Sequence, residues 1–119
     1  MSGGQKSRIN LARAVYSKAD IYLLDDPLSA VDINVSNHIF YNLIGPSGLL
    51  RNKTRIFITN SLNYLEVVDS VIFLEDGQIT EFGTYKDLME KKGSLSKFIN
   101  INKSNERHIE SKYNFMINY

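Results

Sequence analysis

The sequence predicts an α/β fold, in which flanking helices cover a partial parallel sheet, and three observations support this. Apolar residues recur at helical spacing over residues 6–16. A short apolar run at 21–24 follows and ends in two aspartates and a proline, which is typical of a buried parallel strand meeting its loop. A second strand is predicted at 55–59 after another helical stretch, so helices and strands alternate along the chain.

The helix between these two strands is bounded by residues that typically begin and end helices. Asp32 can cap its first turn, because a carboxylate accepts hydrogen bonds from the free N–H groups there. Gly45 and Pro46 end it. After the second strand, Ser61 is predicted to cap a short helix.

A β-hairpin is predicted around Asp76 and Gly77, flanked by strands at 71–74 and 78–82. The two-residue turn that matches strand twist needs positive φ at both central positions. Asp tolerates that conformation and Gly adopts it freely.

Two helices are predicted in the C-terminal part, at 84–91 and 94–101. Beyond them the chain becomes polar and loses its periodicity. We therefore expect one domain over residues 1–101 and a disordered tail or linker over 102–119.

The composition argues against several kinds of function. A formal net charge of +1, with scattered basic residues, gives no field that would attract nucleic acid. The chain contains no cysteine, so it has neither disulfides nor thiolate metal sites. No apolar run reaches the roughly 20 residues that span a bilayer, so any membrane association is expected to come through a partner.

The first helix opens with the run Ser2-Gly3-Gly4-Gln5. Glycines let the backbone approach an anion closely, and the free N–H groups of a helix N-terminus point toward it. Taken alone, the run is a weak signal and is better explained as a simple turn before a helix.

Two adjacent carboxylates, Asp25 and Asp26, follow the first predicted strand. Open parallel sheets place their ligand chemistry at this end of a strand. Asp25 could hold Mg²⁺ through water, and Asp26 could orient or deprotonate an attacking water, as phosphoryl transfer requires. The alternative is that both acids only cap the following turn.

Two runs, SGGQKSRINLARAVY and DIYLLDDPLSAVD, together resemble the signature helix, Walker B strand and D-loop of ATP-binding-cassette (ABC) transporters. The resemblance continues through HIFYNLIGPSGLLRNKTRIFIT, VDSVIFLEDGQITEFGTYKDL and KKGSLSKFI, and so covers nearly everything before the tail. The run DDPLSAVD and the insertion IGPSGLL most resemble the corresponding segments in the first nucleotide-binding domain of the C subfamily, the multidrug-resistance-associated proteins.

This resemblance implies ATP and Mg²⁺ as cofactors, with two nucleotide-binding domains sandwiching ATP between them. It implies a second such domain and the transmembrane domains of a transporter as partners, at the cytosolic face of a membrane. Asp25 and Asp26 would act on nucleotide bound by their own domain, and Asp32 would couple the two sites. The residues that would contact the γ-phosphate of ATP held by the opposing domain are those of the signature: Ser2, Gly3, Gly4 and Gln5.

The sequence departs from the resembled pattern at two positions that bear on catalysis. Asp26 stands where hydrolytically competent members have Glu, and its carboxylate is withdrawn by one methylene. Asn60 stands where the family has its switch histidine, and an amide cannot exchange a proton near neutral pH. Both changes predict a degenerate site that binds nucleotide without efficient turnover.

The phosphate-binding pattern G-x-x-x-x-G-K-[ST] does not occur in the sequence. By resemblance to P-loop NTPases, the strand that carries this loop would lie centrally in the sheet, between the strands at 55–59 and 71–74. We therefore expect unpaired strand edges and a poorly folded isolated chain. Two alternatives to an ATPase half stay open: a non-catalytic regulatory fragment that docks on an intact nucleotide-binding domain, or a truncated gene product.

Overall fold

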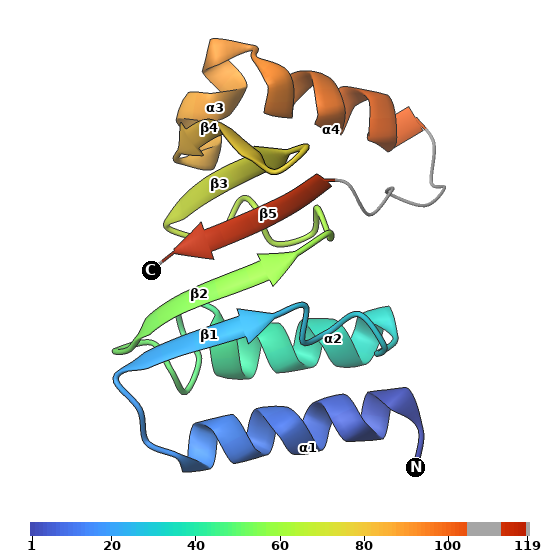
Figure 1. The fold of residues 1–119 in the computed structure, drawn as a ribbon, viewed down its shortest axis with the longest axis vertical. Coiled ribbons are helices and arrows are strands. Elements are labelled where there is room, and N and C mark those ends of the chain that lie inside the picture. The colour runs from blue at the N-terminus through green and yellow to red at the C-terminus, as the bar shows by residue number, and fades with distance from the viewer. Residues whose placement is uncertain (105–112, 119) are drawn as a thin grey trace.

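The computed structural model describes residues 1–104 and 113–118, and it shows an α/β fold built on one five-stranded sheet (Figure 1). The strand order is β1-β2-β5-β3-β4. The strands are β1 (Ile21–Asp25), β2 (Thr54–Thr59), β3 (Ser70–Glu75), β4 (Gln78–Gly83) and β5 (Tyr113–Asn118).

Helices lie at both ends of this stack of strands. Figure 1 shows α1 and α2 at the β1 end and α3 and α4 at the β4 end. The helices are α1 (Gly3–Tyr16), α2 (Ile33–Ile39), the π-helical turn η1 (Phe40–Ile44), α3 (Tyr85–Lys91) and α4 (Ser94–Ser104). The predicted α/β class is confirmed, because β1 and β2 pair in parallel and are flanked by helices.

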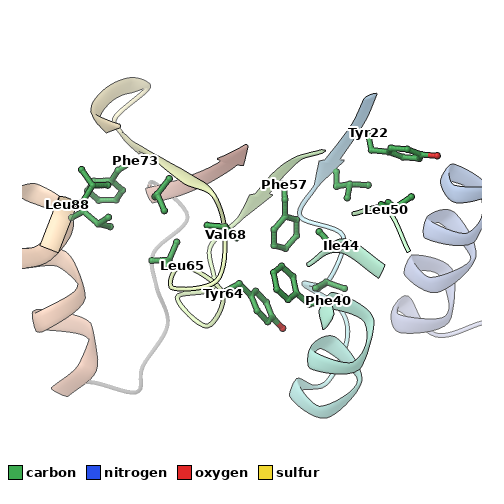
Figure 2. Close-up of a cluster of buried hydrophobic side chains, with 14 of the residues drawn as sticks. Tyr22, Phe40, Ile44, Leu50, Phe57, Tyr64, Leu65, Val68, Phe73 and Leu88 are labelled. Atoms are coloured by element: carbon green, nitrogen blue, oxygen red, sulfur yellow. The ribbon is translucent and has the colours of Figure 1, made fainter. Parts of the chain in front are cut away.

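Aromatic side chains form the centre of the core (Figure 2). Phe57 of β2 is fully buried and lies 5.8 Å from Phe40, measured between ring centroids. Phe40 in turn stacks on Tyr64 at 4.0 Å. The core therefore joins β2 to η1 and to the loop that precedes β3.

Arg55 fixes the end of η1 against β2. Its side chain is buried, and Nη1 donates to the carbonyl oxygens of Ile44 at 2.6 Å and Gly45 at 3.0 Å. Carbonyl groups at a helix end have no partner within the helix, so the guanidinium satisfies them from the sheet. The predicted stop at Gly45 is thus confirmed and is held by a tertiary contact.

The predicted hairpin is confirmed. Asp76 and Gly77 have φ values of 48° and 79°, the left-handed conformation that the turn requires. β3 and β4 pair across it, with Glu75 opposite Gln78.

Two local predictions were wrong. Ser61 does not start a helix: its hydroxyl accepts from the Asn63 N–H at 3.2 Å, and this local bond holds a turn instead. β1 is also not buried on both faces, since Ile21 and Leu23 are 60% and 73% exposed while Tyr22 and Leu24 are buried. The apolar run of β1 therefore has one face in solvent.

The C-terminal part differs from the expected disordered tail over 102–119. Helix α4 continues to Ser104, and β5 lies between β2 and β3, antiparallel to both. The inner edges of β2 and β3, which were expected to be unpaired, are therefore both paired by β5. Residues 105–112 and 119 lie outside the described residues, and the division of the chain at residue 101 stays a prediction.

Candidate functional site

Asp26 and Asn60 are brought together where the parallel strands β1 and β2 end. The backbone N–H of Asp26 donates to the carbonyl oxygen of Ile58 at 2.8 Å, which extends the pairing of the strands by one residue. The chain then turns sharply, because Asp26 has φ of 47°. On β2, the Ser61 N–H donates to Thr59 Oγ1 at 3.0 Å and fixes the turn that carries Asn60.

A pocket of about 280 Å³ lies in front of these strand ends. Asp26 and Asn60 line it together with small hydroxyl side chains and apolar groups. Within the described residues, the amide oxygen Oδ1 of Asn60 is buried and has no hydrogen-bond partner. A buried amide oxygen without a partner is costly, so this atom is available to a ligand group that enters the pocket. The remaining lining residues are Leu28, Ser29, Val31, Ile33, Ser36, Thr59, Ser61 and Tyr64.

The Asp25 side chain lies on the other side of the same strand end. It is exposed and lines a second pocket, formed with Ser7 and Asn10 of α1, whereas Asp26 borders both pockets. The two neighbouring carboxylates therefore face partly different surroundings. This divergence suits the different roles predicted for them.

The donor set suits Mg²⁺ only when a ligand supplies further oxygens. In the described part of the chain, no group of three or more His, Cys, Asp or Glu residues could enclose a metal ion. Mg²⁺ usually keeps several waters and binds through one or two carboxylates plus substrate phosphates. Asp25, an exposed carboxylate at the end of β1, fits that pattern.

The loop between Asp26 and α2 is held by buried hydrogen bonds. The Ser36 hydroxyl, which is buried, lies 3.4 Å from the Leu28 carbonyl oxygen and 3.3 Å from that of Val31. Asp32 caps α2, because its Oδ1 accepts from the N–H groups of Asn34 and Val35, both at 3.1 Å. The predicted cap is confirmed, and it leaves Asp32 exposed at the surface of the loop.

The signature residues form a capping box at the start of α1. Ser2 Oγ accepts from the Gln5 N–H at 3.2 Å, and Gln5 Oε1 accepts from the Ser2 N–H at 2.9 Å. Ser2, Gly3 and Gln5 are exposed. None of the residues from Ser2 to Gln5 lines the pocket of Asp26.

Both glycines of the signature lie against the loop after β1. A Cβ atom added at Gly3 would come within 3.3 Å of the Ala30 Cβ, and one at Gly4 within 3.1 Å of the Ala30 carbonyl oxygen. Larger residues would therefore push α1 away from this loop. The close packing of α1 against Ala30 is therefore a reason for glycine at both positions, in addition to any role in binding an anion.

Tyr64 is a pocket residue that the sequence interpretation assigned no role. Its hydroxyl donates to Asn37 Oδ1 at 3.0 Å, and its ring stacks on Phe40. Burial raises the pKa of the Tyr64 hydroxyl, with a smaller contribution from Tyr41. Tyr64 therefore forms a neutral wall of the pocket, and no local pattern in the sequence distinguishes it from other apolar-face tyrosines.

Asp26 is expected to destabilise the fold at neutral pH. Burial raises the pKa of its carboxyl above the usual 3.8, the adjacent charge of Asp25 raises it further, and the Ser29 hydroxyl partly offsets both. The folded chain thus binds this proton more tightly than the unfolded chain. Stability therefore falls as the pH rises through the raised pKa, and the cost of the ionised form disappears below about 3.8.

The substitution Asp26→Asn should accordingly raise the midpoint of thermal unfolding at pH 7. Asn keeps the tolerance for positive φ and removes the charge. The gain should shrink as the pH is lowered toward 4, about the usual pKa of an aspartate, where Asp26 itself becomes neutral. Melting curves at both pH values test this, with the exposed Asp69→Asn as control. An equal gain at both pH values would refute the electrostatic explanation.

The ABC transporter family profile matches residues 1–29. The chain is 55% identical over 97 residues to ATP-binding cassette sub-family C member 2 of Rattus norvegicus, covering 82% of this chain and 6% of that protein. It is 52% identical over 99 residues to sub-family C member 3 of Homo sapiens, covering 83% of this chain and 6% of that protein.

A third relative is the multidrug resistance protein mrp-7 of Caenorhabditis elegans, 51% identical over 104 residues, which are 87% of this chain and 7% of that protein. The chain therefore spans only about 6–7% of the length of these curated relatives. Among the helices of the described residues, none has the length and apolar character that a membrane-spanning helix requires.

Proposed function

The chain belongs to the ATP-binding cassette transporters, as part of a nucleotide-binding domain of sub-family C, and from this premise we propose that it contributes to two ATP sites at once. One is the site of its own domain, through Asp25, Asp26 and Asn60. The other is the site of an opposing domain, through the start of α1. Both would serve ATP-driven transport by transmembrane domains outside this sequence.

The observation that carries the proposal is the pocket shared by Asp26 and Asn60 at the ends of β1 and β2. It combines a carboxylate with a buried amide oxygen that has no partner among the described residues. A carboxylate can hold an attacking water, and the Asn60 amide group can turn its N–H toward a phosphate oxygen. The phosphate loop of the same domain would have to bring the nucleotide to this edge.

Mg²⁺, when bound, neutralises charge that develops on the transferred phosphoryl group. Asp25 would orient it through water, from the side of the strand end that faces α1. Asp26 would orient the attacking water. Its raised pKa leaves it a somewhat better proton acceptor than an ordinary aspartate.

The signature would act on the opposite nucleotide. Ser2, Gly3 and Gln5 are exposed and lie away from the pocket of Asp26, so they are accessible to a ligand held by another domain. The Ser2 hydroxyl is engaged in the capping box and would have to exchange that hydrogen bond for one to a phosphate oxygen. Asp32, at the start of α2 on the loop that touches Gly3 and Gly4 through Ala30, would couple the two sites.

We further propose that the chain's own site is degenerate. Asp26 offers a carboxylate one methylene shorter than Glu, and a misplacement of about 1 Å can lower a rate about 100-fold. Asn60 cannot exchange protons as a histidine does. Both features favour retention of ATP over its hydrolysis.

A chimera separates the two roles: residues 1–101 replace the matching segment of a hydrolytically active sub-family C relative. Ser2→Ala should lower hydrolysis at the opposing site and leave nucleotide binding at the chain's own site unchanged. Asp25→Asn should weaken Mg²⁺-dependent binding at its own site. Ser17→Ala, at the other end of α1, is the matched control. Loss of activity at the same site from both variants would refute the division of roles, and docking with no ATPase signal would favour a regulatory fragment.

A further inference from the structure

The start of α4 carries a serine that basic residues precede. Lys91 and Lys92 stand three and two positions before Ser94, and the apolar Leu95 follows it. Many protein kinases select a serine or threonine by basic side chains at these positions, because acidic groups beside the kinase active site bind them. The sequence around Ser94 therefore has the charge pattern of a phosphorylation site.

The structure leaves the basic residues and the serine at the surface. Lys91, Lys92 and Ser94 are exposed, and Gly93 between them is partly exposed. Lys92 ends α3 in the left-handed conformation, with φ of 54°, so the backbone changes direction two residues before Ser94. Figure 1 shows the two helices at the β4 end of the molecule, opposite α1. Ser94 and both lysines are thus accessible from solvent at this end.

A threonine with similar basic neighbours shows what the position of Ser94 adds. Thr54 follows Arg51 and Lys53, but it is the first residue of β2. It pairs with Ile21 of β1, and its N–H donates to the Asp20 carbonyl oxygen at 3.1 Å. A kinase binds its substrate as an extended segment along its own cleft, and a strand paired within a sheet is not free to enter that cleft. The two positions therefore differ in their backbone surroundings rather than in charge.

Glu81 of β4 holds the first turn of α4, on which Ser94 lies. Its side chain is buried, and its Oε2 accepts from the Leu95 N–H at 3.1 Å. The other carboxylate oxygen lies so close to Gly93 that a Cβ atom added there would overlap it. N–H groups at a helix start need acceptors, and a negative charge there is stabilised by the helix dipole. This contact, the Glu81 cap, therefore fixes the turn that must open before Ser94 can enter a kinase.

We propose that Ser94 is a phosphorylation site for a protein kinase that selects serines preceded by basic residues, and that the Glu81 cap limits how fast it is modified. In this reaction, Ser94 Oγ attacks the γ-phosphorus of ATP bound to the kinase. The bond from that phosphorus to the β,γ-bridging oxygen breaks, ADP leaves, and the hydroxyl proton passes to a base of the kinase. Ser94 lines neither pocket beside Asp26, so the inference is independent of the proposed ATP sites.

The site is tested by incubating the full chain with radiolabelled ATP and the catalytic subunit of cyclic-AMP-dependent protein kinase, which selects basic residues at these positions. The chain should be labelled, and mass spectrometry of its fragments should place the phosphate on Ser94. Lys91→Gln combined with Lys92→Gln should lower the rate at least about tenfold, since losing a charge-assisted contact typically weakens binding by about that factor. No phosphate on Ser94, or a rate that the two lysines do not affect, would overturn the proposal.

Two serine variants separate the site from its neighbours. Ser94→Ala should remove the label. Ser96→Ala, at a buried position of the same helix, should leave the label unchanged. A label found on Thr54 instead of Ser94 would mean that basic neighbours suffice, and it would overturn the argument from the backbone surroundings.

Glu81→Gln tests the role of the cap. The amide keeps the size of the side chain and removes its charge, so the first turn of α4 should open more often and the labelling rate should rise roughly threefold or more. Glu75→Gln, in the same hairpin, is the matched control and should not change the rate. A synthetic peptide of residues 88–98, which has no Glu81 to cap it, should be labelled faster than the chain. Equal rates for peptide and chain, or no gain from Glu81→Gln, would overturn the role given to the cap.

Discussion

The chimera that carries Asp26→Glu and Asn60→His should hydrolyse ATP at the chain's own site about 100-fold faster than the chimera with the native segment. The longer side chain brings the carboxylate closer to an attacking water. The imidazole adds a group that can exchange a proton near neutral pH. Single-turnover hydrolysis, measured at that site with the opposing site inactivated, checks the expected gain.

This gain should have a cost in stability. Position 26 has φ of 47°, a conformation that Asp tolerates better than Glu, so the double variant should be destabilised by about 1 kcal/mol. Asn60→His alone, which leaves position 26 unchanged, separates the kinetic effect from this cost. If the double variant binds ATP but hydrolyses no faster, Asp26 and Asn60 do not limit turnover.

Phe57→Ala should destabilise the folded chain by about 3–5 kcal/mol, the range for removing a buried aromatic ring. The Phe57 side chain is fully buried, and it packs from β2 against the stacked pair Phe40 and Tyr64. The cavity would open directly behind β2, the strand that ends at Thr59 just before Asn60. Urea unfolding curves of the two proteins, fitted with the same dependence of the free energy on urea concentration, give the change in the free energy of unfolding.

Phe82→Ala is the control for this loss, because the Phe82 side chain is 63% exposed. It removes the same ring from the surface and should change the stability by about 0.5 kcal/mol or less. Similar effects from the two substitutions would mean that the aromatic cluster is not the centre of the core.

Local patterns predicted much of the fold correctly. The turn at Asp76 and Gly77 and the cap at Asp32 depend on residues close in sequence, and both are confirmed. The stop at Gly45 is also confirmed, although Arg55 of β2 helps to hold it. Asp26 was singled out by its place after the first strand and Asn60 by the family resemblance, and the two meet because the parallel strands β1 and β2 end at the same edge of the sheet. What the sequence predicted of the site was therefore mainly its carboxylates and its amide.

Long-range contacts account for what was missed. The run from Tyr113 to Asn118 contains three consecutive apolar residues and no clear alternation, and it becomes a strand by pairing with the distant strands β2 and β3. Tyr64 becomes a pocket wall only because Asn37 and Phe40 of another segment lie against it. Ser61 was misassigned because a serine that caps a helix and one that holds a turn share the same local sequence signal.

The chimera with the native segment tests the central claim most directly, when ATP binding and hydrolysis are measured at the chain's own site on the same preparation. The account predicts ATP bound in a Mg²⁺-dependent manner and hydrolysed at least about 10-fold more slowly than in the unmodified relative, since a displaced carboxylate and a missing imidazole each lower the rate. Hydrolysis at the rate of the unmodified relative would contradict it.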